Sequence, residues 1–290
     1  MKRFKKYLIQ SIFGLLVLIA FISFFARRLS PPGGRLNQSF NRKLDSGLVT
    51  AVYDGDTLKV RFQNGIERKV RLIGVDSMER GDEEDEASFW AHIARRFSFY
   101  HLYKKRIKLG YDRELEDSYG RLLAYVWKDG VLFNDLLIRE GLASALLVFP
   151  FRQDYMERFR NSEQYAKREG KGLWGREDFP RINLSQLRDY RGKIACVEFR
   201  CSDTEKKRGF LFLQAPGRVF AALIPFDCLS RFPKPGYFLG KKLVVSGFIE
   251  EYKGQPQVVV CYSRQITIRE RFPEGPGIKE EAGKSRKAAF

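Results

Sequence analysis

Three short segments carry the charged side chains whose types and spacing best suit chemistry. They are Asp54-Gly55-Asp56-Thr57, Arg71-Leu72-Ile73-Gly74-Val75-Asp76-Ser77-Met78-Glu79 and Asp117-Ser118-Tyr119-Gly120-Arg121. The carboxylates of Asp56 and Asp76 are oxygen ligands of the kind that a hard cation such as calcium takes. Glu79 follows closely enough to act on a metal-bound water without ligating the metal. The guanidinium groups of Arg71 and Arg121 match phosphate oxygens two at a time. Together these groups can deprotonate water and neutralise charge on phosphorus, so they predict phosphodiester cleavage.

In this order and spacing, the segments resemble the staphylococcal nuclease (thermonuclease) family, from about residue 47 to residue 174. Any one segment alone would be a weak signal, because Asp-Gly-Asp also occurs in hairpin turns. The resemblance implies a calcium-dependent endonuclease that acts on DNA and RNA and leaves 3′-phosphate ends. It also implies a small five-stranded barrel of the OB type with three helices.

The resemblance assigns a role to each residue of the metal site. Asp56 and Asp76 would ligate Ca2+, with the backbone carbonyl of Ser77 as a further ligand. Asp54 and Thr57 would not ligate the metal themselves but would lie next to its ligands and hold them in place. The expected cofactor is therefore a calcium ion held mainly by carboxylates.

The same resemblance assigns the phosphate-binding residues. Arg71 and Arg121 would hold the scissile phosphate, and Glu79 would activate or orient the attacking water. Tyr119 would bond a terminal phosphate. The expected catalytic residues are therefore Arg71, Glu79 and Arg121.

The chain departs from the family pattern at four positions near the site. Met78 replaces the usual proline before the glutamate, so the turn that presents Glu79 is less rigidly fixed. Ser118 stands where the staphylococcal enzyme has a lysine, and Leu147 and Phe149 replace two tyrosines. These changes concern base stacking and substrate preference, whereas the expected cleavage residues are all retained.

The elements that must position these residues can be read from the pattern. Residues 57–62 and 66–73 form alternating runs joined at Asn64-Gly65, a strong hairpin signal. A helix is expected from residue 82 to about residue 100, and its aromatic side chains are interpreted as core. Further strands are expected at residues 48–53, 106–111 and 121–127, and further helices at residues 133–140 and 155–169. The predicted fold class is mainly β with helices (α+β), with a catalytic domain at residues 46–176.

A second domain is expected at residues 181–269. Five strands are predicted there, at residues 193–199, 209–214, 219–224, 242–252 and 255–260. This stretch is similar to nucleic-acid-binding OB-fold modules, partly open five-stranded barrels that use aromatic and basic side chains. The candidate ligand-binding residues are Phe210, Phe212, Phe220, Tyr252, Arg208, Arg218 and Lys253. Each aromatic among them can equally fill the barrel core. Residues 270–290 are expected to form a disordered tail.

The first 28 residues predict a membrane segment. Residues 7–26 are almost wholly apolar and follow a cluster of lysine and arginine. About twenty helical residues span roughly 30 Å, the thickness of a bilayer core. We expect an uncleaved transmembrane anchor, because cleavage after Ala26 would place the bulky Phe24 at an unfavourable position. The catalytic domain would then lie outside the cytoplasm at the cell membrane. Cleavage, giving a secreted or periplasmic protein, is the alternative. Residues 29–45 are expected to be a linker.

Composition narrows the function classes. The net charge is +18, from 53 Lys+Arg against 35 Asp+Glu, which attracts polyanions such as nucleic acid but also anionic lipid. His92 and His101 are too far apart on a helix to form a metal pair, and we expect both to be partly exposed. The four cysteines match no zinc pattern, and both disulfides and buried thiols remain open.

The leading hypothesis is thus a membrane-tethered, calcium-dependent nuclease with DNA or RNA as its substrate. The alternative is a non-catalytic nucleic-acid-binding or scaffold protein at the cell envelope. A third reading is a structural envelope protein whose basic surface meets lipid. No protein partner can be inferred from the sequence.

Overall fold

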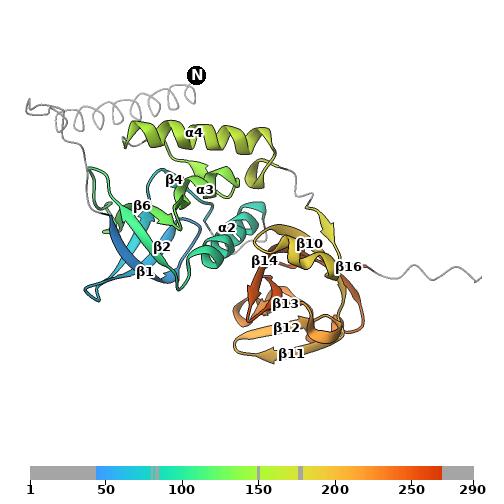
Figure 1. Ribbon diagram of the computed structural model, residues 1–290. Helices are drawn as coiled ribbons and strands as arrows, with labels where there is room; N and C mark the ends of the chain where they lie inside the picture. The colour runs from blue at the N-terminus through green and yellow to red at the C-terminus, as the bar shows by residue number, and fades with distance from the viewer. Residues whose placement is uncertain (1–43, 80, 82–84, 149–150, 176–178, 270–290) are drawn as a thin grey trace, which may run out of the picture. The chain divides into compact units, whose positions relative to one another are not determined.

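The structure is a computed structural model that describes residues 44–79, 81, 85–148, 151–175 and 179–269 (Figure 1). The predicted anchor, nearly all of the predicted linker, the predicted tail and Phe149 lie outside these residues. Within the described ranges, no helix has both the length and the apolar character that crossing a bilayer requires. The described residues form an α+β structure with two β-sheet regions.

The first sheet follows an order that closes it into a barrel. Its strands are β1 (Asp45–Val52), β2 (Thr57–Phe62), β3 (Glu67–Leu72), β5 (Arg106–Gly110), β6 (Leu122–Lys128) and β7 (Val131–Leu132). The order is β3-β2-β1-β5-β6-β7, and β3 also pairs with β6. A register shift between Val49 and Ala51 interrupts β1, and β1 pairs with β2 on one side and β5 on the other. Such a bulge bends a strand, which helps a small sheet close. Strands β3, β2, β1, β5 and β6 close on themselves through the β3–β6 pair, and β7 is a short addition next to β6. The five-stranded barrel expected from the resemblance is therefore confirmed.

The hairpin between β2 and β3 forms where the sequence predicts it. Gly65 adopts a φ of +82°, a left-handed conformation that glycine adopts without steric cost. The side chain of Asn64 accepts a hydrogen bond of 3.1 Å from the backbone of Ile66. Leu58 and Val60 are fully buried, whereas Lys59 and Arg61 alternate with them and pair with Glu67 on the outer face. The alternation of residue types therefore sets which face of the hairpin enters the core.

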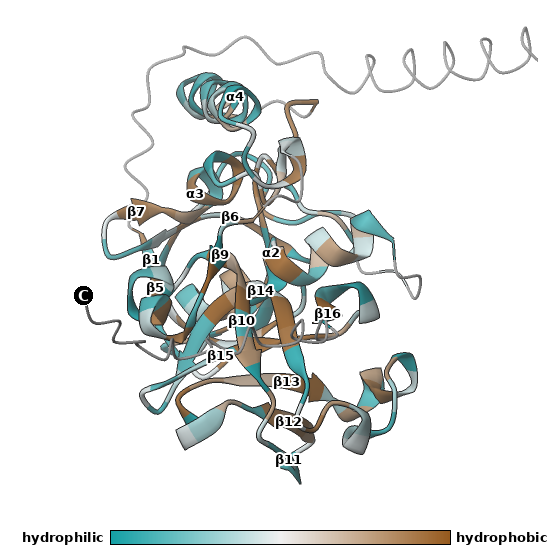
Figure 2. Cartoon of the chain, turned by 90° about the vertical axis from the view of Figure 1, so that its right-hand side faces the viewer, coloured by the Kyte–Doolittle hydropathy of each residue, from teal (hydrophilic) through white to brown (hydrophobic). Residues whose placement is uncertain are grey.

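Helices support this barrel. They are α2 (Glu86–Leu102), α3 (Phe133–Arg139), α4 (Gln153–Arg168) and the 3-10 turn η1 (Gly172–Trp174). Asp85 caps α2, because its carboxylate accepts a hydrogen bond of 2.7 Å from the backbone of Ser88. Helix α4 is largely hydrophilic (Figure 2), and only Phe159, Ser162 and Ala166 are buried along it. A short pair, β4 (Val75–Asp76) with β8 (Ser144–Ala145), lies at the site described below.

The second sheet contains all five predicted strands and three others. Its strands are β9 (Arg181–Ile182), β10 (Ile194–Arg200), β11 (Asp203–Lys207), β12 (Phe210–Gln214), β13 (Ala221–Pro225), β14 (Lys242–Tyr252), β15 (Gln255–Val259) and β16 (Ile266–Arg269). Strands β9, β11 and β16 are the three that the sequence did not predict. The order is β11-β12-β13-β15-β14-β10-β9, with β16 on β14. Short 3-10 helices connect them: η2 (Leu184–Tyr190), η3 (Pro216–Arg218), η4 (Phe226–Arg231), η5 (Pro235–Tyr237) and η6 (Ser263–Gln265). Cys201, Cys228 and Cys261 are buried thiols within this region.

Helix α2 contacts both sheets. His92 lies with Nε2 2.9 Å from the backbone oxygen of Val259, and Arg96 forms an ion pair with Glu250. The ring of Phe97 meets that of Phe248 at 5.7 Å between centroids. The expectation that His92 is partly exposed is therefore wrong. It is buried, because the second sheet covers this face of α2.

Phe220 corrects a second expectation. Its side chain is fully buried in the core of the second sheet, where its ring meets that of Phe199 at 5.1 Å. A buried ring cannot stack on a nucleic-acid base, so Phe220 is a core residue. Phe210 and Phe212 behave differently: both are half-buried and pack against a small separate cluster of Ala221, Leu223 and Val259.

Candidate active site

Asp56 and Arg71 meet because β2 and β3 are paired in register. Thr57, the first residue of β2, lies opposite Arg71, and the backbone of Leu72 donates a hydrogen bond of 2.9 Å to the Asp56 carbonyl. The guanidinium of Arg71 then pairs with the Asp56 carboxylate through Nη1 and with Asp76 through Nη2, the latter at 3.0 Å. One arginine thus joins the two carboxylates that the sequence assigned to a cation.

A tight turn at Gly74 brings Asp76 back to the guanidinium of Arg71. Gly74 adopts a φ of +72°, and a Cβ added there would lie only 2.7 Å from the ring of Phe159 and 2.8 Å from that of Phe151. Only glycine therefore fits between β3 and β4. Asp76 follows on β4 with its side chain half exposed, and its backbone carbonyl accepts a hydrogen bond from the Ser144 hydroxyl at 3.3 Å.

The Asp56 carboxylate is completely buried and fully partnered. Besides Arg71, its Oδ2 accepts a hydrogen bond of 2.6 Å from the Ser77 backbone, and its Oδ1 accepts one of 3.1 Å from the Thr57 hydroxyl. The Asp54 carboxylate accepts a hydrogen bond of 3.2 Å from the Asp56 backbone, which shapes the turn. A buried carboxylate is tolerated only with such partners. Asp54 and Thr57 thus both hydrogen-bond to Asp56, and their supporting roles at a metal stay predictions. The observed contact of Ser77 is made by its N–H, and the role of its carbonyl stays a prediction.

Arg121 lies at the start of β6, whose parallel pairing with β3 brings it near Arg71. The side chain of Asp117 holds it from within the same loop. Asp117 accepts hydrogen bonds from the Arg121 backbone at 2.9 Å and from its Nε at 2.7 Å. Burial alone would raise the pKa of Asp117, but these hydrogen bonds and the charge of Arg121 outweigh it and lower that pKa. Asp117 therefore stays ionised and orients Arg121.

The two arginines influence each other electrostatically. Burial lowers the pKa of Arg71; the charge of Asp76 opposes this effect, and the charge of Arg121 adds to it. The two guanidinium groups therefore lie close enough to repel each other. A phosphate that bridged them would relieve the repulsion.

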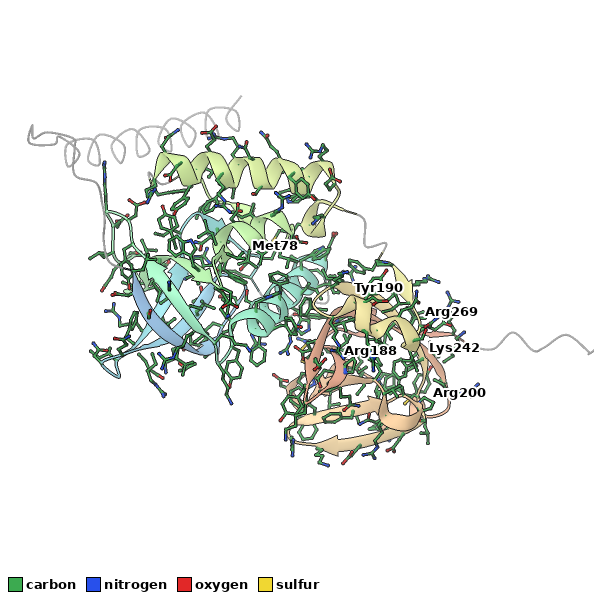
Figure 3. The ribbon with its side chains drawn as sticks, viewed as in Figure 1. Met78, Arg188, Tyr190, Arg200, Lys242 and Arg269 are labelled. Atoms are coloured by element: carbon green, nitrogen blue, oxygen red, sulfur yellow. The ribbon has the colours of Figure 1, made fainter. Side chains whose placement is uncertain are left out.

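Glu79 and Tyr119 are exposed residues at the rim. Glu79 makes no hydrogen bond or ion pair with any residue that the structure describes, and the neighbouring Met78 is also exposed (Figure 3). Tyr119 is 83% exposed, and its ring lies 5.4 Å from the Arg121 guanidinium. The roles predicted for Glu79 and Tyr119 stay predictions, because both groups face solvent.

Two carboxylates of the site suit a hard cation, but they supply only some of the oxygen ligands that such a cation takes. Asp56 and Asp76 both direct carboxylate oxygens at one guanidinium, and oxygen donors suit calcium. Among the described residues, no group of three or more His, Cys, Asp or Glu side chains could hold a metal ion. Calcium takes about six to eight oxygens, so backbone, water or substrate would have to complete the shell.

Residues of helix α2 hydrogen-bond to the turn at residues 54–56 and pack against it. The hydroxyl of Ser98 donates a hydrogen bond of 2.6 Å to the Gly55 carbonyl. A Cβ added at Gly55 would lie 2.8 Å from the Cβ of Ser77 and 2.9 Å from that of Ala94. The sequence assigned no role to Ser98, Ala94 or Asp117. Glycine between two aspartates was the one signal of a close approach at this point.

Comparison with known proteins supports the interpretation of this site. The profile of the family described as "Staphylococcal nuclease homologue" matches residues 69–176. That range contains Arg71, Asp76, Glu79 and Arg121, and it ends before β9.

Three relatives have names that refer to nuclease activity. The chain is 34% identical over 164 residues to the thermonuclease of Staphylococcus intermedius, covering 56% of this chain and 96% of that protein. It is 31% identical over 163 residues to the thermonuclease of Staphylococcus hyicus, covering 56% and 95%. It is 31% identical over 139 residues to endonuclease YncB of Bacillus subtilis (strain 168), covering 48% and 65%. The chain therefore belongs to the staphylococcal nuclease (thermonuclease) family, and it is a nuclease whose substrate is nucleic acid.

Proposed function

We propose that this nuclease is a calcium-dependent endonuclease that hydrolyses DNA and also accepts RNA, leaving 3′-phosphate ends. The observation that carries the proposal is the pairing of Asp56 and Asp76 with one guanidinium, that of Arg71, beside a second arginine held by Asp117. Carboxylates and guanidinium groups at one point match the charges of a divalent cation and a phosphodiester.

Different residues of the chain would carry out different parts of the cleavage reaction. Arg71 and Arg121 would bind the non-bridging oxygens of the scissile phosphate and neutralise the charge that grows on them in the transition state. Glu79, free in solvent at the rim, would take a proton from the attacking water. Asp56 and Asp76 would hold calcium, which when bound supplies positive charge to the phosphate and orients water.

The proposal is tested by cleavage of plasmid DNA in calcium and then in chelator. Arg121→Ala should lower kcat by about 10²-fold, the loss seen when a transition-state donor is removed. Arg113→Ala is the matched control, because Arg113 lies in the same connection between β5 and β6 and its side chain is exposed. Full activity of Arg121→Ala, or full activity in chelator, would refute the corresponding part of the proposal.

Glu79→Gln tests the role of the base. The variant keeps the shape of the side chain but cannot accept a proton, so kcat should fall while substrate binding persists. Labelling of the product ends tests the bond that breaks: 3′-phosphate products carry 5′-hydroxyl ends that polynucleotide kinase phosphorylates directly.

We also infer that the second sheet is an OB-type barrel. Strands β10 and β11 follow each other with only Cys201 and Ser202 between them, although they stand near opposite ends of the pairing order. The parallel pair β13–β15 matches the parallel pair β3–β6 of the first barrel. If β10 and β11 form one bent strand, the second sheet closes into a barrel. Its strands then follow the same cyclic order as the strands of the first barrel. An experimental structure in which β10 and β11 do not run as one bent strand would refute this inference.

Finally, we propose that the catalytic residues act outside the cytoplasm, tethered by the apolar segment at residues 7–26. The support is the sequence of that segment and the cations before it. External protease on cells whose wall has been removed should then degrade the nuclease domain. Protection of the domain until the membrane is lysed would refute this orientation.

A further inference from the structure

A groove of about 1140 Å³ lies apart from the residues of the active site. One wall comes from β11 to β15, including the β11–β12 and β14–β15 turns, together with Arg191. The other comes from the end of α2, the turn after it and the turn after β6. Both walls belong to the same compact unit, which begins at residue 42. None of Asp54, Asp56, Arg71, Asp76 or Arg121 lines this groove.

Aromatic rings line both walls. Phe210 and Phe212 stand on the same face of β12, with ring centroids 6.4 Å apart, and both are half-buried. On the other wall, Phe99 and Tyr103 are stacked at 4.3 Å. Tyr252, at the end of β14, is 52% exposed. Exposed and half-exposed rings that line one groove offer flat apolar faces on which a ligand can stack.

The groove is also positively charged. Each acidic residue that lines it forms an ion pair with a neighbouring cation. The pairs are Arg96–Glu250, Arg191–Glu251, Lys207–Glu205 and Lys128–Asp129. Lys104, Lys105, Arg208 and Lys253 also line it, and none has a carboxylate partner among the described residues. These four side chains give the groove a net positive charge that nothing on its walls neutralises.

Three of these cations stand at turn tips. Lys104, Arg208 and Lys253 have φ values of +56°, +52° and +51°, which is the left-handed region. They belong to the turn after α2, the β11–β12 turn and the β14–β15 turn. Three separate turns therefore each present a cation to one groove that has aromatic walls.

We propose that this groove binds a single strand of nucleic acid. The phosphates would follow the cations at the turn tips, while bases stack on Tyr252 and on the pair Phe210 and Phe212. Rings and cations in a groove are the combination that single strands use, because every base has a π-face and every nucleotide has a charge. A duplex hides the faces of its bases, so the aromatic walls favour a single strand.

A second cationic area is a weaker candidate. Arg200, Lys242 and Arg269 lie side by side on the neighbouring strands β10, β14 and β16 (Figure 3). Lys242 and Arg269 share the carboxylate of Glu198, and Arg200 bonds the Gly240 carbonyl at 2.9 Å. This area therefore has less unneutralised charge than the groove.

Binding is measured with the full-length chain carrying Arg121→Ala, in chelator, so that cleavage is absent and Arg121 does not contribute. Any binding through Arg71 is the same in the test and control variants, so their comparison isolates the groove. The probe is a fluorescein-labelled 20-nucleotide oligothymidylate, followed by anisotropy. The test variant is Tyr252→Ser with Lys253→Asn, because asparagine tolerates the left-handed backbone at position 253. The loss of one stacking ring and one cation should raise Kd about tenfold or more.

The chain offers a matched control on the same sheet region. Tyr237 is also an exposed tyrosine beside a lysine, Lys241, and neither lines the groove. Tyr237→Ser with Lys241→Asn should change Kd less than twofold. In addition, Arg208→Asn should reduce the salt dependence of log K by about 0.7, the value for one phosphate contact on a single strand.

Three results would overturn the proposal. The first is equal loss of binding in the test and control variants. The second is binding of a 20-base-pair duplex as tightly as the single strand. The third is binding of phosphatidylglycerol vesicles that the Tyr252/Lys253 variant loses while it keeps the oligonucleotide, which would assign the groove to a lipid surface. Because cleavage is absent throughout, the result is independent of the proposed catalytic function.

Discussion

The hydroxyl of Ser98 donates a hydrogen bond of 2.6 Å to the backbone carbonyl of Gly55, and both residues are buried. Gly55 lies between Asp54 and Asp56, and Ser98 lies in the C-terminal half of α2. The carboxylate of Asp56 is therefore positioned by the helix as well as by its own strand. Helix α2 in turn contacts the second sheet through His92 and Arg96.

Replacement of Ser98 by alanine should weaken both stability and catalysis. The Gly55 carbonyl would be left buried without a partner, which costs about 1–3 kcal/mol. The turn that carries Asp56 would then loosen, and kcat should fall. Ser162→Ala is the control, because Ser162 is buried and donates a hydrogen bond of 2.6 Å to Asp135 on α3. Urea denaturation and plasmid cleavage should show both variants destabilised but only Ser98→Ala slowed. Equal kcat in the two variants would contradict the positioning role.

Replacement of Gly55 by alanine should push the turn away from α2. The new Cβ would meet the Cβ atoms of Ser77 and Ala94 at 2.8 and 2.9 Å, closer than real Cβ contacts. Overpacking of this kind typically costs about 1–3 kcal/mol. Gly236→Ala is the control, since a Cβ there meets nothing within 4 Å. The thermal midpoint and kcat should fall for Gly55→Ala and stay unchanged for Gly236→Ala. A variant at Gly55 with normal kcat would show that the turn can shift without harm.

The sequence was sufficient to predict the longer strands and the helices, because these depend on local patterns. Alternation in β2 and β3 and the Asn64-Gly65 pair fix the hairpin, and the hairpin places Arg71 beside Asp56. The roles of the carboxylates and arginines came from the family resemblance of the three motifs, and they stay predictions. The boundaries of the two predicted domains, residues 46–176 and 181–269, also stay predictions.

What the sequence missed depends on contacts between distant segments. No local pattern links Ser98 to Gly55, or His92 to the backbone of Val259. Phe210 and Phe220 have the same residue type, yet one lines a groove and the other is buried. That difference depends on how the strands close around the core, which composition and periodicity do not specify.

Replacement of Arg71 by lysine should lower activity strongly although the charge is kept. A single ammonium cannot reach Asp56 and Asp76 in the way that two nitrogens of one planar group do. The buried Asp56 would lose a partner, and the phosphate would lose a forked donor, so kcat should fall by about 10²-fold. Arg61→Lys is the control, because Arg61 also bonds a carboxylate, that of Glu67, through two nitrogens, but on the exposed outer face of the barrel. Comparable kcat for the two lysine variants would contradict this role of Arg71.

Stability should depend on pH through His101. Burial lowers the pKa of His101 below its ordinary value of 6.5, and the smaller effect of the Glu140 charge opposes this shift. Because the unfolded chain then binds the proton more readily, the stabilising contribution is complete above pH 6.5 and is lost as the pH falls below that value. The ring lies 4.4 Å from that of Phe97, so His101→Phe keeps an aromatic contact and removes the titrating group. The free energy of unfolding in urea, measured from pH 7.5 to pH 5.0, should decline less steeply for His101→Phe than for the unaltered chain. Parallel curves would show that His101 is as easily protonated in the folded protein as in the unfolded chain.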